Sequence, residues 1–519
     1  MLSYPYHNFY EVMQANTKND PKKTAIFIDD RKVSYQELKA KIDGFARVLV
    51  SLGLQAKERV AMIVGNSEEF VIALYAITKL GAVAVPLNTF LKKEEFDYIL
   101  NDAQARLLIS SASFANETKE LLHTTPIEKI IWTEGYEHLD ANNLNFSYDI
   151  VDEKTEDSCL ANLDDLACIV YTSGTTGKPK GAMLSYRNLF SNSIAGAESF
   201  QITAKDRFIV FLPMFHSFTL SIMVLLPMYA CSSLVIVKSV FPFANVLKQT
   251  LLKQVTIFLG VPTLYNALLK AKIPWYFMWF NKVRIFISGS APLSEQALNE
   301  FNAKFKKARL LEGYGLSECS PAVCVNRLDR QKPLSVGLPL PSYEVKIVND
   351  EIVEVKTGEI GEIMVKGDCV MQGYLNHPDA TDETIINGWL LTGDLGKKDD
   401  EGFIYIVDRK KDLIISKGIN IYPREIEEII YKFDGVDAVA VIGIKDETND
   451  EEVLAFIQPK ENIQLSESDI RSYLKKHLAN FKLPKHIYFV EELPKNATGK
   501  VLKRVLKEKV VGGNFIRKK

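Results

Sequence analysis

The stretch VAMIVGNSEEFVIALYAITKLGAVAVPL (60–87) indicates the fold class of this chain. It begins with the apolar run VAMIVG (60–65) and ends with a second one, GAVAVPL (81–87), both of strand length. Between the two runs, apolar residues recur at helical spacing: Phe70, Ala73, Leu74 and Ile77. Strand, helix and strand joined by short connections form a βαβ unit, which requires a parallel sheet. The sequence therefore predicts an α/β protein.

A helix with a clear start signal precedes this unit. Ser34 and Glu37 have the spacing of a capping box, and Val33 and Leu38 have the spacing of a hydrophobic staple. Apolar residues continue at helical spacing as far as Leu49. Helices and strands therefore alternate through the first 100 residues.

A smaller domain of a different pattern is expected after residue 408. The segment DDEGFIYIVDRKKD (399–412) combines a turn, a strand and a cluster of charges. After it the sequence predicts helix 423–433, strands 439–444 and 452–459, helix 467–479 and strand 486–490. We therefore expect a large N-terminal domain of layered βαβ subdomains (1–408) and a small α+β C-terminal domain (409–519).

Composition and charge exclude several classes of protein. Among 519 residues, Lys plus Arg number 63 and Asp plus Glu number 65, a net charge of −2. This balance argues against a disordered chain and against a nucleic-acid binder that works by bulk charge. The balance hides an uneven distribution, because residues 409–519 hold 22 basic and 17 acidic side chains, and residues 482–519 hold 11 and 3. A basic small domain suits polyanionic ligands.

The cysteines and the apolar stretches favour a cytoplasmic protein. Six scattered cysteines without a CxxC pair are too few for a disulfide scaffold, and no secretory signal is read at the start. Residues 208–237 carry no Lys, Arg, Asp or Glu, and a membrane-spanning helix needs about 20 mainly apolar residues. Pro213, Pro227 and the strand-like LVIV (234–237) interrupt this stretch, so we expect a buried helix followed by a buried strand.

The segment YTSGTTGKPKGA (171–182) has the composition of a phosphate-binding loop. Two glycines and four hydroxyl residues lie within seven positions, and Lys178 and Lys180 follow them. Backbone N–H groups and hydroxyls can donate to phosphate oxygens, and glycines allow a close approach. The spacing does not fit the P-loop pattern GxxxxGK[ST]. By composition alone, the segment could also be a flexible turn.

This loop resembles the signature loop of the adenylate-forming superfamily, which includes acyl-CoA synthetases, luciferases and peptide-synthetase adenylation domains. Further motifs follow in the order of that family: PMFHSF (213–218), SGSAPLS (288–294), EGYGLSE (312–318), TGD (392–394), DRKKDLIISKG (408–418) and PKNATGK (494–500). The resemblance extends over essentially the whole chain. It implies an enzyme that activates a carboxylic acid with ATP and passes the acyl group to a thiol.

The resemblance assigns most of the ATP site to the loop and to EGYGLSE. Its implied ATP-binding residues are Thr172, Ser173, Gly174, Thr175, Thr176, Gly177, Lys180, Gly289, Glu312, Gly313, Tyr314, Ser317, Asp394, Arg409 and Lys500. Among these, Tyr314 would stack on adenine and Asp394 would accept hydrogen bonds from the ribose hydroxyls. Glu318, with the Thr175 hydroxyl, would hold Mg²⁺, a hard cation that prefers oxygen ligands. By composition alone, Glu318 reads as a solvated side chain and Asp394 as a turn residue.

The remaining implied roles concern the acid, the hinge and CoA. His216 would admit the carboxylate substrate, although a histidine in an apolar stretch also reads as a core residue. Lys500 would stabilise charge at the α-phosphate during adenylation. Lys411 would be the hinge about which a mobile C-terminal domain turns, and Gly418 would line the CoA channel.

The substrate that the resemblance favours is a medium- or long-chain fatty acid, because the apolar stretches after His216 and at 260–269 look like those of bacterial fatty-acyl-CoA ligases. Alternatives are an aryl acid, a carrier-protein thiol as acceptor, or a non-catalytic fatty-acid-binding protein on the same fold. The aromatic cluster WYFMWF (275–280) could line an acyl tunnel, touch the inner face of a membrane, or form a buried helix.

Overall fold

The chain folds into two compact units. The computed structural model describes residues 2–133, 135–148, 161–172, 178–240, 242–289, 293, 295–416, 419–445, 451–495 and 501–512. The chain divides into two compact units: residues 1–345 with 365–390, and residues 346–364 with 391–519. Each unit is described by itself.

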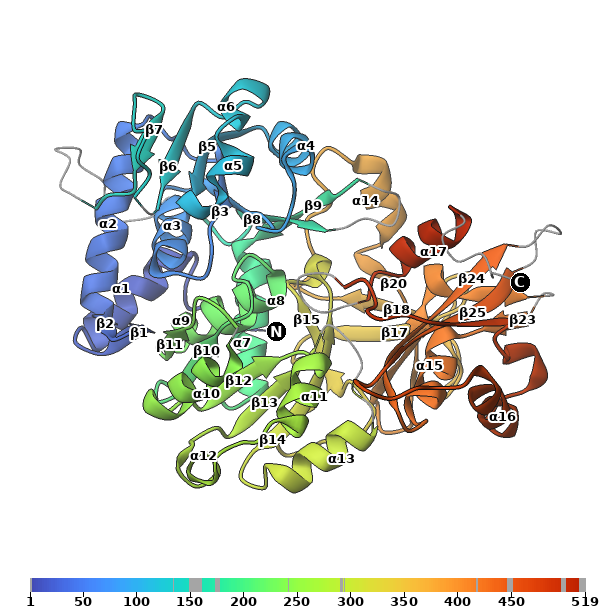
Figure 1. Ribbon diagram of the computed structural model, residues 1–519. Helices are drawn as coiled ribbons and strands as arrows, with labels where there is room; N and C mark the ends of the chain where they lie inside the picture. Colours follow the sequence, from blue (N-terminus) through green and yellow to red (C-terminus); the bar gives the residue numbers. More distant parts are fainter. Residues whose placement is uncertain are drawn as a thin grey trace. The chain divides into compact units, whose positions relative to one another are not determined.

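The first unit contains, among the described residues, a seven-stranded sheet (Figure 1). Its strands, in spatial order, are β7 (Asn143–Asn145), β6 (Lys129–Trp132), β5 (Ala105–Ser110), β3 (Arg59–Ile63), β4 (Val83–Pro86), β8 (Leu166–Thr172) and β9 (Lys180–Ser185). All neighbours are parallel except the β8–β9 hairpin. Helix α3 (Glu68–Lys79) connects β3 to β4. The βαβ prediction for residues 60–87 is therefore confirmed.

A nine-stranded sheet forms the other half of the first unit (Figure 1). Its described strands, in order, are β16 (Leu338–Pro339), β15 (Ala322–Val325), β14 (Arg309–Gly315), β13 (Ile285–Ser288), β12 (Ile257–Gly260), β10 (Arg207–Val210), β11 (Ser233–Ile236), β1 (Thr24–Ile28) and β2 (Arg31–Ser34). The strands from β14 to β1 are parallel, and antiparallel strands lie at both edges.

Helices that contact one another, and of which α7 contacts strands of both sheets, join the two halves. They are α1 (Phe9–Asn19), α2 (Tyr35–Ser51), α3, α7 (Tyr186–Ser199) and α9 (Leu226–Tyr229). Buried Phe9 packs edge-on against Tyr186 and Phe190 of α7 and also contacts Tyr75 of α3. The start of α2 has both hydrogen bonds of the predicted capping box between Ser34 and Glu37.

Other helices cover the outer side of each sheet. Helices α4 (Lys93–Ala103) and α6 (Leu121–Thr124) pack on alternate apolar residues of the seven-stranded sheet. Helices α10 (Phe243–Leu252), α11 (Pro262–Lys270), α12 (Trp275–Phe280) and α13 (Glu295–Lys304) pack on the nine-stranded sheet. The remaining short elements of this unit are η1 (Ala112–Phe114), α5 (Ala115–Thr118), α14 (Pro378–Thr384) and β19 (Ile385–Ile386).

The uncharged stretch 208–237 is buried in the first unit. It contains most of β10, then α8 (Ser217–Thr219), a π-helical turn η2 (Leu220–Leu225), α9 and β11, and most of its side chains are inaccessible to solvent. The expected buried helix and buried strand are confirmed. Within the described part of the chain, every helix is too short or too polar to cross a bilayer.

The second unit has the predicted α+β pattern. One of its sheets has the order β17 (Glu344–Val348), β18 (Gly361–Lys366), β20 (Trp389–Lys398), with β21 (Ile404–Arg409) paired to β20. The other described strands are β22 (Ile414–Ser416), β23 (Ile419–Ile421), β24 (Val436–Lys445), β25 (Glu451–Pro459) and β26 (His486–Phe489). Its helices are α15 (Pro423–Tyr431), α16 (Glu467–His477) and α17 (Lys503–Val511). The five elements predicted between residues 423 and 490 are confirmed.

The predicted domain boundary near residue 408 remains a prediction. The second unit, defined by contacts, includes 346–364 and 391–408 in addition to residues 409–519. The large and small divisions of the chain agree with the expected architecture.

Candidate active site

A hairpin holds the predicted phosphate loop in the first unit. Strands β8 and β9 pair antiparallel, with Thr172 opposite Lys180 at the end of the ladder. The loop residues themselves, Ser173, Gly174, Thr175, Thr176 and Gly177, lie outside the described residues. The ammonium of Lys180 lies 5.3 Å from the ring centre of Tyr374. The hairpin therefore fixes both ends of the loop and places one cation at its second end.

Glu318 lies beside the first end of this loop. It belongs to the 3₁₀ turn η3 (Ser317–Cys319), which follows β14. Its Oε1 accepts a hydrogen bond of 2.9 Å from the hydroxyl of Tyr374 and a longer one of 3.4 Å from the Thr172 hydroxyl. The structure thus brings together two predicted site residues that are 146 positions apart, Thr172 and Glu318.

Tyr374 is a candidate site residue that sequence reasoning missed. Backbone hydrogen bonds tie its segment to η3 and β9: Met371 N to Glu318 O, Gln372 N to Met183 O, and Leu375 N to Gly181 O. Burial, and then the negative charge of Glu318, raise the pKa of Tyr374 well above its usual range. The phenol therefore stays protonated and donates to the carboxylate. No local signal distinguishes this tyrosine, because its role depends on a contact across 56 residues.

The oxygen groups around Glu318 fit a magnesium ion that arrives with substrate phosphates. Among the described residues, no group of three His, Cys, Asp or Glu side chains could hold a metal alone. Mg²⁺ commonly binds through one or two carboxylates together with phosphate oxygens and waters. One carboxylate with hydroxyl neighbours is a donor set of this kind.

Several other predicted residues follow the carboxyl ends of neighbouring parallel strands. Strands β10, β13 and β14 run parallel within the nine-stranded sheet, and His216, Gly289 and Tyr314 lie after, or at, their carboxyl ends. Ligands of open α/β sheets bind in this position, outside the carboxyl ends of the strands. The sheet therefore gathers three motifs that are spread over 98 positions of the sequence, from His216 to Tyr314.

Direct contacts join these motifs. The hydroxyls of Ser217 and Ser317 are 2.8 Å apart, so the start of α8 bonds to the turn that carries Glu318. His216 caps α8, with its Nδ1 accepting from the backbone N–H of Phe218 at 3.3 Å. A Cβ atom at Gly289 would lie 2.7 Å from the Phe218 ring, which explains why glycine stands there.

The predicted adenine-site residues form part of β14. Glu312 is buried and lies opposite Ser288, while Gly313 and Tyr314 pair with β15 and are partly exposed. The Glu312 carbonyl accepts from Asn326 N at 2.9 Å. Backbone pairing on both sides thus fixes this strand, and the stacking role of Tyr314 remains a prediction.

Asp394 and Arg409 form an ion pair within the second unit. They are opposite each other on β20 and β21, with Arg409 Nε 3.1 Å from Asp394 Oδ1. Asp394 is 6% exposed, whereas the Arg409 side chain is 41% exposed. The carboxylate is thus oriented by the guanidinium, which itself reaches solvent.

Asp408 positions the residue next to it. Its two carboxylate oxygens accept from the backbone N–H groups of Arg409 and Arg424, at 2.8 and 2.9 Å. Burial raises the pKa of Asp408. This carboxylate ties the end of β21 to the start of α15, a positioning role that the sequence did not reveal.

The predicted hinge residue is at the surface of the second unit. Lys411 belongs to the exposed 3₁₀ turn η4 (Lys410–Asp412), and the neighbouring Lys410 bonds Asp350 and Glu362 at 2.8 and 2.9 Å. Gly418 and Lys500 lie outside the described residues. Lys495 and Val501, which flank residues 496–500 in sequence, form a β-bridge.

Comparisons with known proteins identify the family. Family profiles described as AMP-binding enzyme and AMP-binding enzyme C-terminal domain match residues 13–375 and 425–500. The long-chain-fatty-acid–CoA ligase of Escherichia coli O6:H1 is 34% identical over 92% of this chain and 90% of its own. The feruloyl-CoA synthase of an Amycolatopsis species is also 34% identical, over 93% and 95%. The structure of ATP-bound MatB from Rhodopseudomonas palustris superposes with a TM-score of 0.88 at 33% identity, covering 97% of this chain and 99% of that one.

This chain belongs to the AMP-binding enzymes, the adenylate-forming superfamily. Within it, the chain is an acyl-CoA synthetase, an acid–CoA ligase that uses ATP and CoA as co-substrates.

Proposed function

We propose that this ligase activates a medium- or long-chain fatty acid. The observation that carries the proposal is the apolar character of the chain that follows His216. From Phe218 to Met228 the residues of α8, η2 and α9 include no charged side chain, and almost all are buried. A substrate carboxylate at His216 would thus have apolar surroundings for its hydrocarbon chain.

Adenylation is the first half-reaction. A carboxylate oxygen of the acid attacks the α-phosphorus of ATP, an O–P bond forms, and the bond to pyrophosphate breaks. The loop residues Ser173 to Gly177 would bind the phosphates, Lys500 would stabilise charge at phosphorus, and Asp394 with Arg409 would bind the ribose. Glu318 and Thr175 would hold Mg²⁺, which supplies charge neutralisation at the phosphates when bound. Tyr374 would keep Glu318 oriented by its hydrogen bond.

Thioester formation is the second half-reaction. The sulfur of CoA attacks the acyl carbonyl, the C–S bond forms, and AMP leaves as the C–O bond breaks; the thiol proton passes to solvent. Lys411 would be the hinge between the proposed domains 1–408 and 409–519, and Gly418 would line the CoA channel. Support comes from the family match, since the C-terminal profile ends at Lys500.

An aryl acid is the second candidate substrate. Feruloyl-CoA synthase matches this chain at the same 34% identity as the fatty-acid ligase. The test is a thioester-forming assay with fatty acids of graded length and with ferulate and benzoate, each with and without CoA. We expect kcat/KM to rise with chain length. Turnover of the aryl acids alone would overturn the fatty-acid proposal, and thioester formation only on a carrier protein would overturn CoA as acceptor.

Lys500→Ala tests the division of labour between the half-reactions. We expect pyrophosphate release to fall by about 100-fold or more, in the range of lost transition-state donors, while thioester formation from supplied acyl-adenylate persists. Equal loss of both half-reactions would contradict domain alternation.

A cytoplasmic location near the inner face of the membrane is part of the same proposal, because long-chain acids partition into bilayers.

A further inference from the structure

Helix α12 exposes four large aromatic side chains. Trp275, Tyr276, Trp279 and Phe280 are 70%, 46%, 71% and 59% exposed. We call these four residues the aromatic patch. They occupy one side of the helix, whereas Phe277 is buried in the core beneath the nine-stranded sheet. The alternative of a buried helix is therefore wrong for these four side chains, whereas a place in the wall of an acyl tunnel remains a prediction.

Packing and hydrogen bonds anchor the helix that carries the aromatic patch. Phe277 and the partly buried Met278 pack on the core that includes Phe301 and Phe305. Asn281 ends the helix, with its side-chain amide donating to the carbonyl of Phe277 at 2.7 Å. The ammonium of Lys307 donates to the carbonyl of Trp279 at 3.1 Å. The aromatic side chains are thus exposed on a helix whose other side packs into the core.

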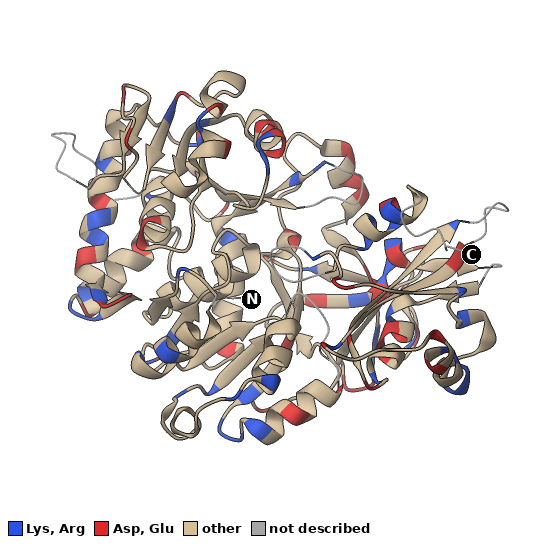
Figure 2. Ribbon diagram, in the orientation of Figure 1, with Lys and Arg blue, Asp and Glu red and all other residues tan. Residues whose placement is uncertain are grey.

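Exposed basic residues flank the helix of the aromatic patch in sequence, and others lie beside its end. Lys270, Lys272 and Lys282 flank α12, and Lys306, Lys307 and Arg309 follow α13. Residues 207–294 contain eight Lys or Arg and no Asp or Glu. Figure 2 shows basic segments at the end of α13, with the acidic residues farther along that helix. The surface therefore combines aromatic and positive character.

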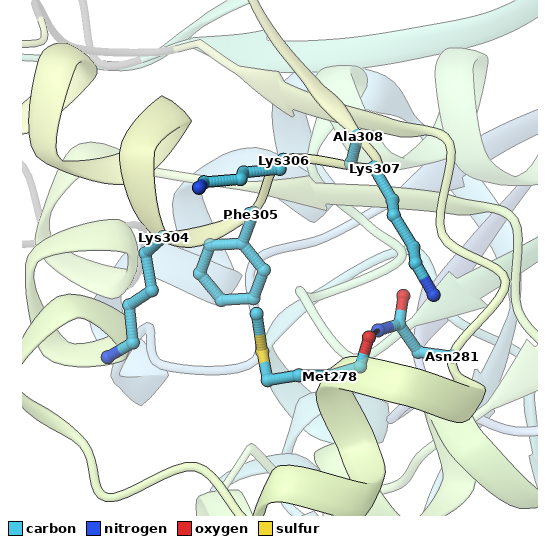
Figure 3. A pocket seen from close by; sticks show the side chains of 7 residues that line it. All are labelled: Met278, Asn281, Lys304, Phe305, Lys306, Lys307 and Ala308. Atoms are coloured by element: carbon cyan, nitrogen blue, oxygen red, sulfur yellow. Dashed lines mark hydrogen bonds between the residues drawn. The ribbon is translucent and has the colours of Figure 1, made fainter.

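A pocket of about 140 Å³ lies between the end of α12 and the end of α13. Its apolar lining comes from Met278, Phe305 and Ala308, and its polar lining from Asn281 and the three lysines at 304, 306 and 307. Figure 3 shows the Phe305 ring facing the Met278 side chain, with the side chains of Lys304 and Lys307 on either side. The ammonium of Lys304 donates to the carbonyls of Leu268, Leu269 and Ala271, and that of Lys307 to Trp279, so both hold the backbone at this place. The pocket therefore adds an apolar floor with the exposed Lys306 beside it.

We propose that the aromatic patch and its lysines dock this enzyme on the surface of a bilayer that contains anionic lipids. Trp and Tyr favour the headgroup level of membranes, and lysines near the surface are attracted to anionic lipids. Protein interfaces, by contrast, are depleted in lysine. Docking would bring the enzyme to an acid that is dissolved in the membrane. This purpose rests on the proposed function.

Vesicle sedimentation of the full-length enzyme, without substrates, tests the proposal. The vesicles are phosphatidylcholine alone or phosphatidylcholine with phosphatidylglycerol at a ratio of about 3:1. We expect at least tenfold tighter binding to the anionic vesicles, weakened by salt because exposed charges are screened. Trp275→Ser with Trp279→Ser should reduce binding at least tenfold, and Lys270→Gln with Lys272→Gln and Lys306→Gln should remove most of the salt dependence.

Matched controls separate the surface from general effects. Phe481→Ser removes an aromatic residue that is 47% exposed in the second unit, and Lys22→Gln with Lys119→Gln removes two exposed lysines elsewhere. These variants should bind vesicles as the wild type does. Thermal melting checks that each variant folds, and quenching of tryptophan fluorescence by brominated lipids reports insertion.

Three results would overturn the proposal. They are no binding of the wild type to anionic vesicles, unchanged binding of the tryptophan variant, or a concentration-dependent dimer, without vesicle binding, that the tryptophan variant abolishes. The last result would assign the patch to a second copy of the chain. Because binding is measured without acid, ATP or CoA, an enzyme that proved specific for aryl acids would still pass or fail this test independently.

Discussion

The Glu318 site and the aromatic patch are both in the first unit, yet they are built by opposite means. At Glu318, polar groups from distant segments meet through hydrogen bonds of 2.9 and 3.4 Å. On α12, four aromatic side chains within a stretch of six residues face solvent, and Trp275 contacts Tyr276 edge-on. The first arrangement requires exact geometry, whereas the second requires only area and charge. The effects of substitutions on activity should therefore differ in size between the two places, and only those on α12 should depend on lipid.

Glu318→Ala should give the largest effect. Loss of the carboxylate removes the proposed magnesium ligand and leaves the Tyr374 hydroxyl without its acceptor. We expect adenylation to fall by about 100-fold or more and the Mg²⁺ requirement to rise. Pyrophosphate release measured over a range of Mg²⁺ concentrations checks this, and an unchanged rate at limiting Mg²⁺ would refute the assignment of Glu318 as ligand.

Asp394→Asn, a substitution in the second unit, should have an intermediate effect on activity. The amide keeps the shape of the side chain but loses the charge that pairs with Arg409 and one acceptor position for the proposed bond to the ribose. A hydrogen bond to a charged group contributes about 1.5–3 kcal/mol, so KM for ATP should rise by roughly tenfold or more. Steady-state kinetics with ATP as the varied substrate measure this. If KM for ATP stays the same while only stability falls, the carboxylate is structural.

Tyr374→Phe should have a smaller effect at the Glu318 site, because it removes one hydrogen bond and almost no volume. We expect a several-fold to tenfold fall in kcat/KM, on the order of 1–1.5 kcal/mol, with a higher Mg²⁺ concentration needed for half-maximal rate. Tyr10→Phe is the matched control, since its hydroxyl donates to Asp43 at 2.7 Å in the same unit. Direct titration of Mg-ATP binding supplies a readout apart from turnover. If the two variants have the same kcat/KM and the same Mg²⁺ requirement, Tyr374 has only a packing role.

Trp275→Ser with Trp279→Ser should have the smallest effect in solution. With hexanoate, an acid that remains dissolved, we expect the rate to stay within about twofold, because exposed surface substitutions usually change stability by less than 0.5 kcal/mol. With a long-chain acid supplied in anionic vesicles, the rate should fall several-fold. A large loss of rate with hexanoate would contradict the contrast between the two regions, because α12 would then contribute to catalysis in solution.

Sequence alone was most successful where the signal is local. The βαβ unit at 60–87, the capping box at Ser34 and the five elements between 423 and 490 are set by hydrophobic periodicity and helix start signals, and the structure has them. Motif order correctly identified the superfamily. The roles of Thr175, Lys500 and Gly418 remain predictions on residues outside the described part of the chain.

Sequence was least informative about contacts between segments. Tyr374 meets Glu318 only because its segment pairs with β9, and Asp408 is significant only because α15 begins beside it. The comparison of 208–237 with 275–280 makes the same point for apolar residues. Both are strongly hydrophobic in sequence, but the first is enclosed by helices and strands, whereas the second has core on one side and solvent on the other.

By itself, the sequence determined the α/β class, the two-part architecture and the chemistry of an adenylate-forming ligase, because periodicity and motif composition are local properties. The tertiary structure decided which carboxylate has a tyrosine donor, which parallel strands bring His216, Gly289 and Tyr314 to one edge, and which aromatic residues reach the surface. Those features depend on sheet order and on packing between distant segments, and the free energy of such contacts exists only once the chain has folded.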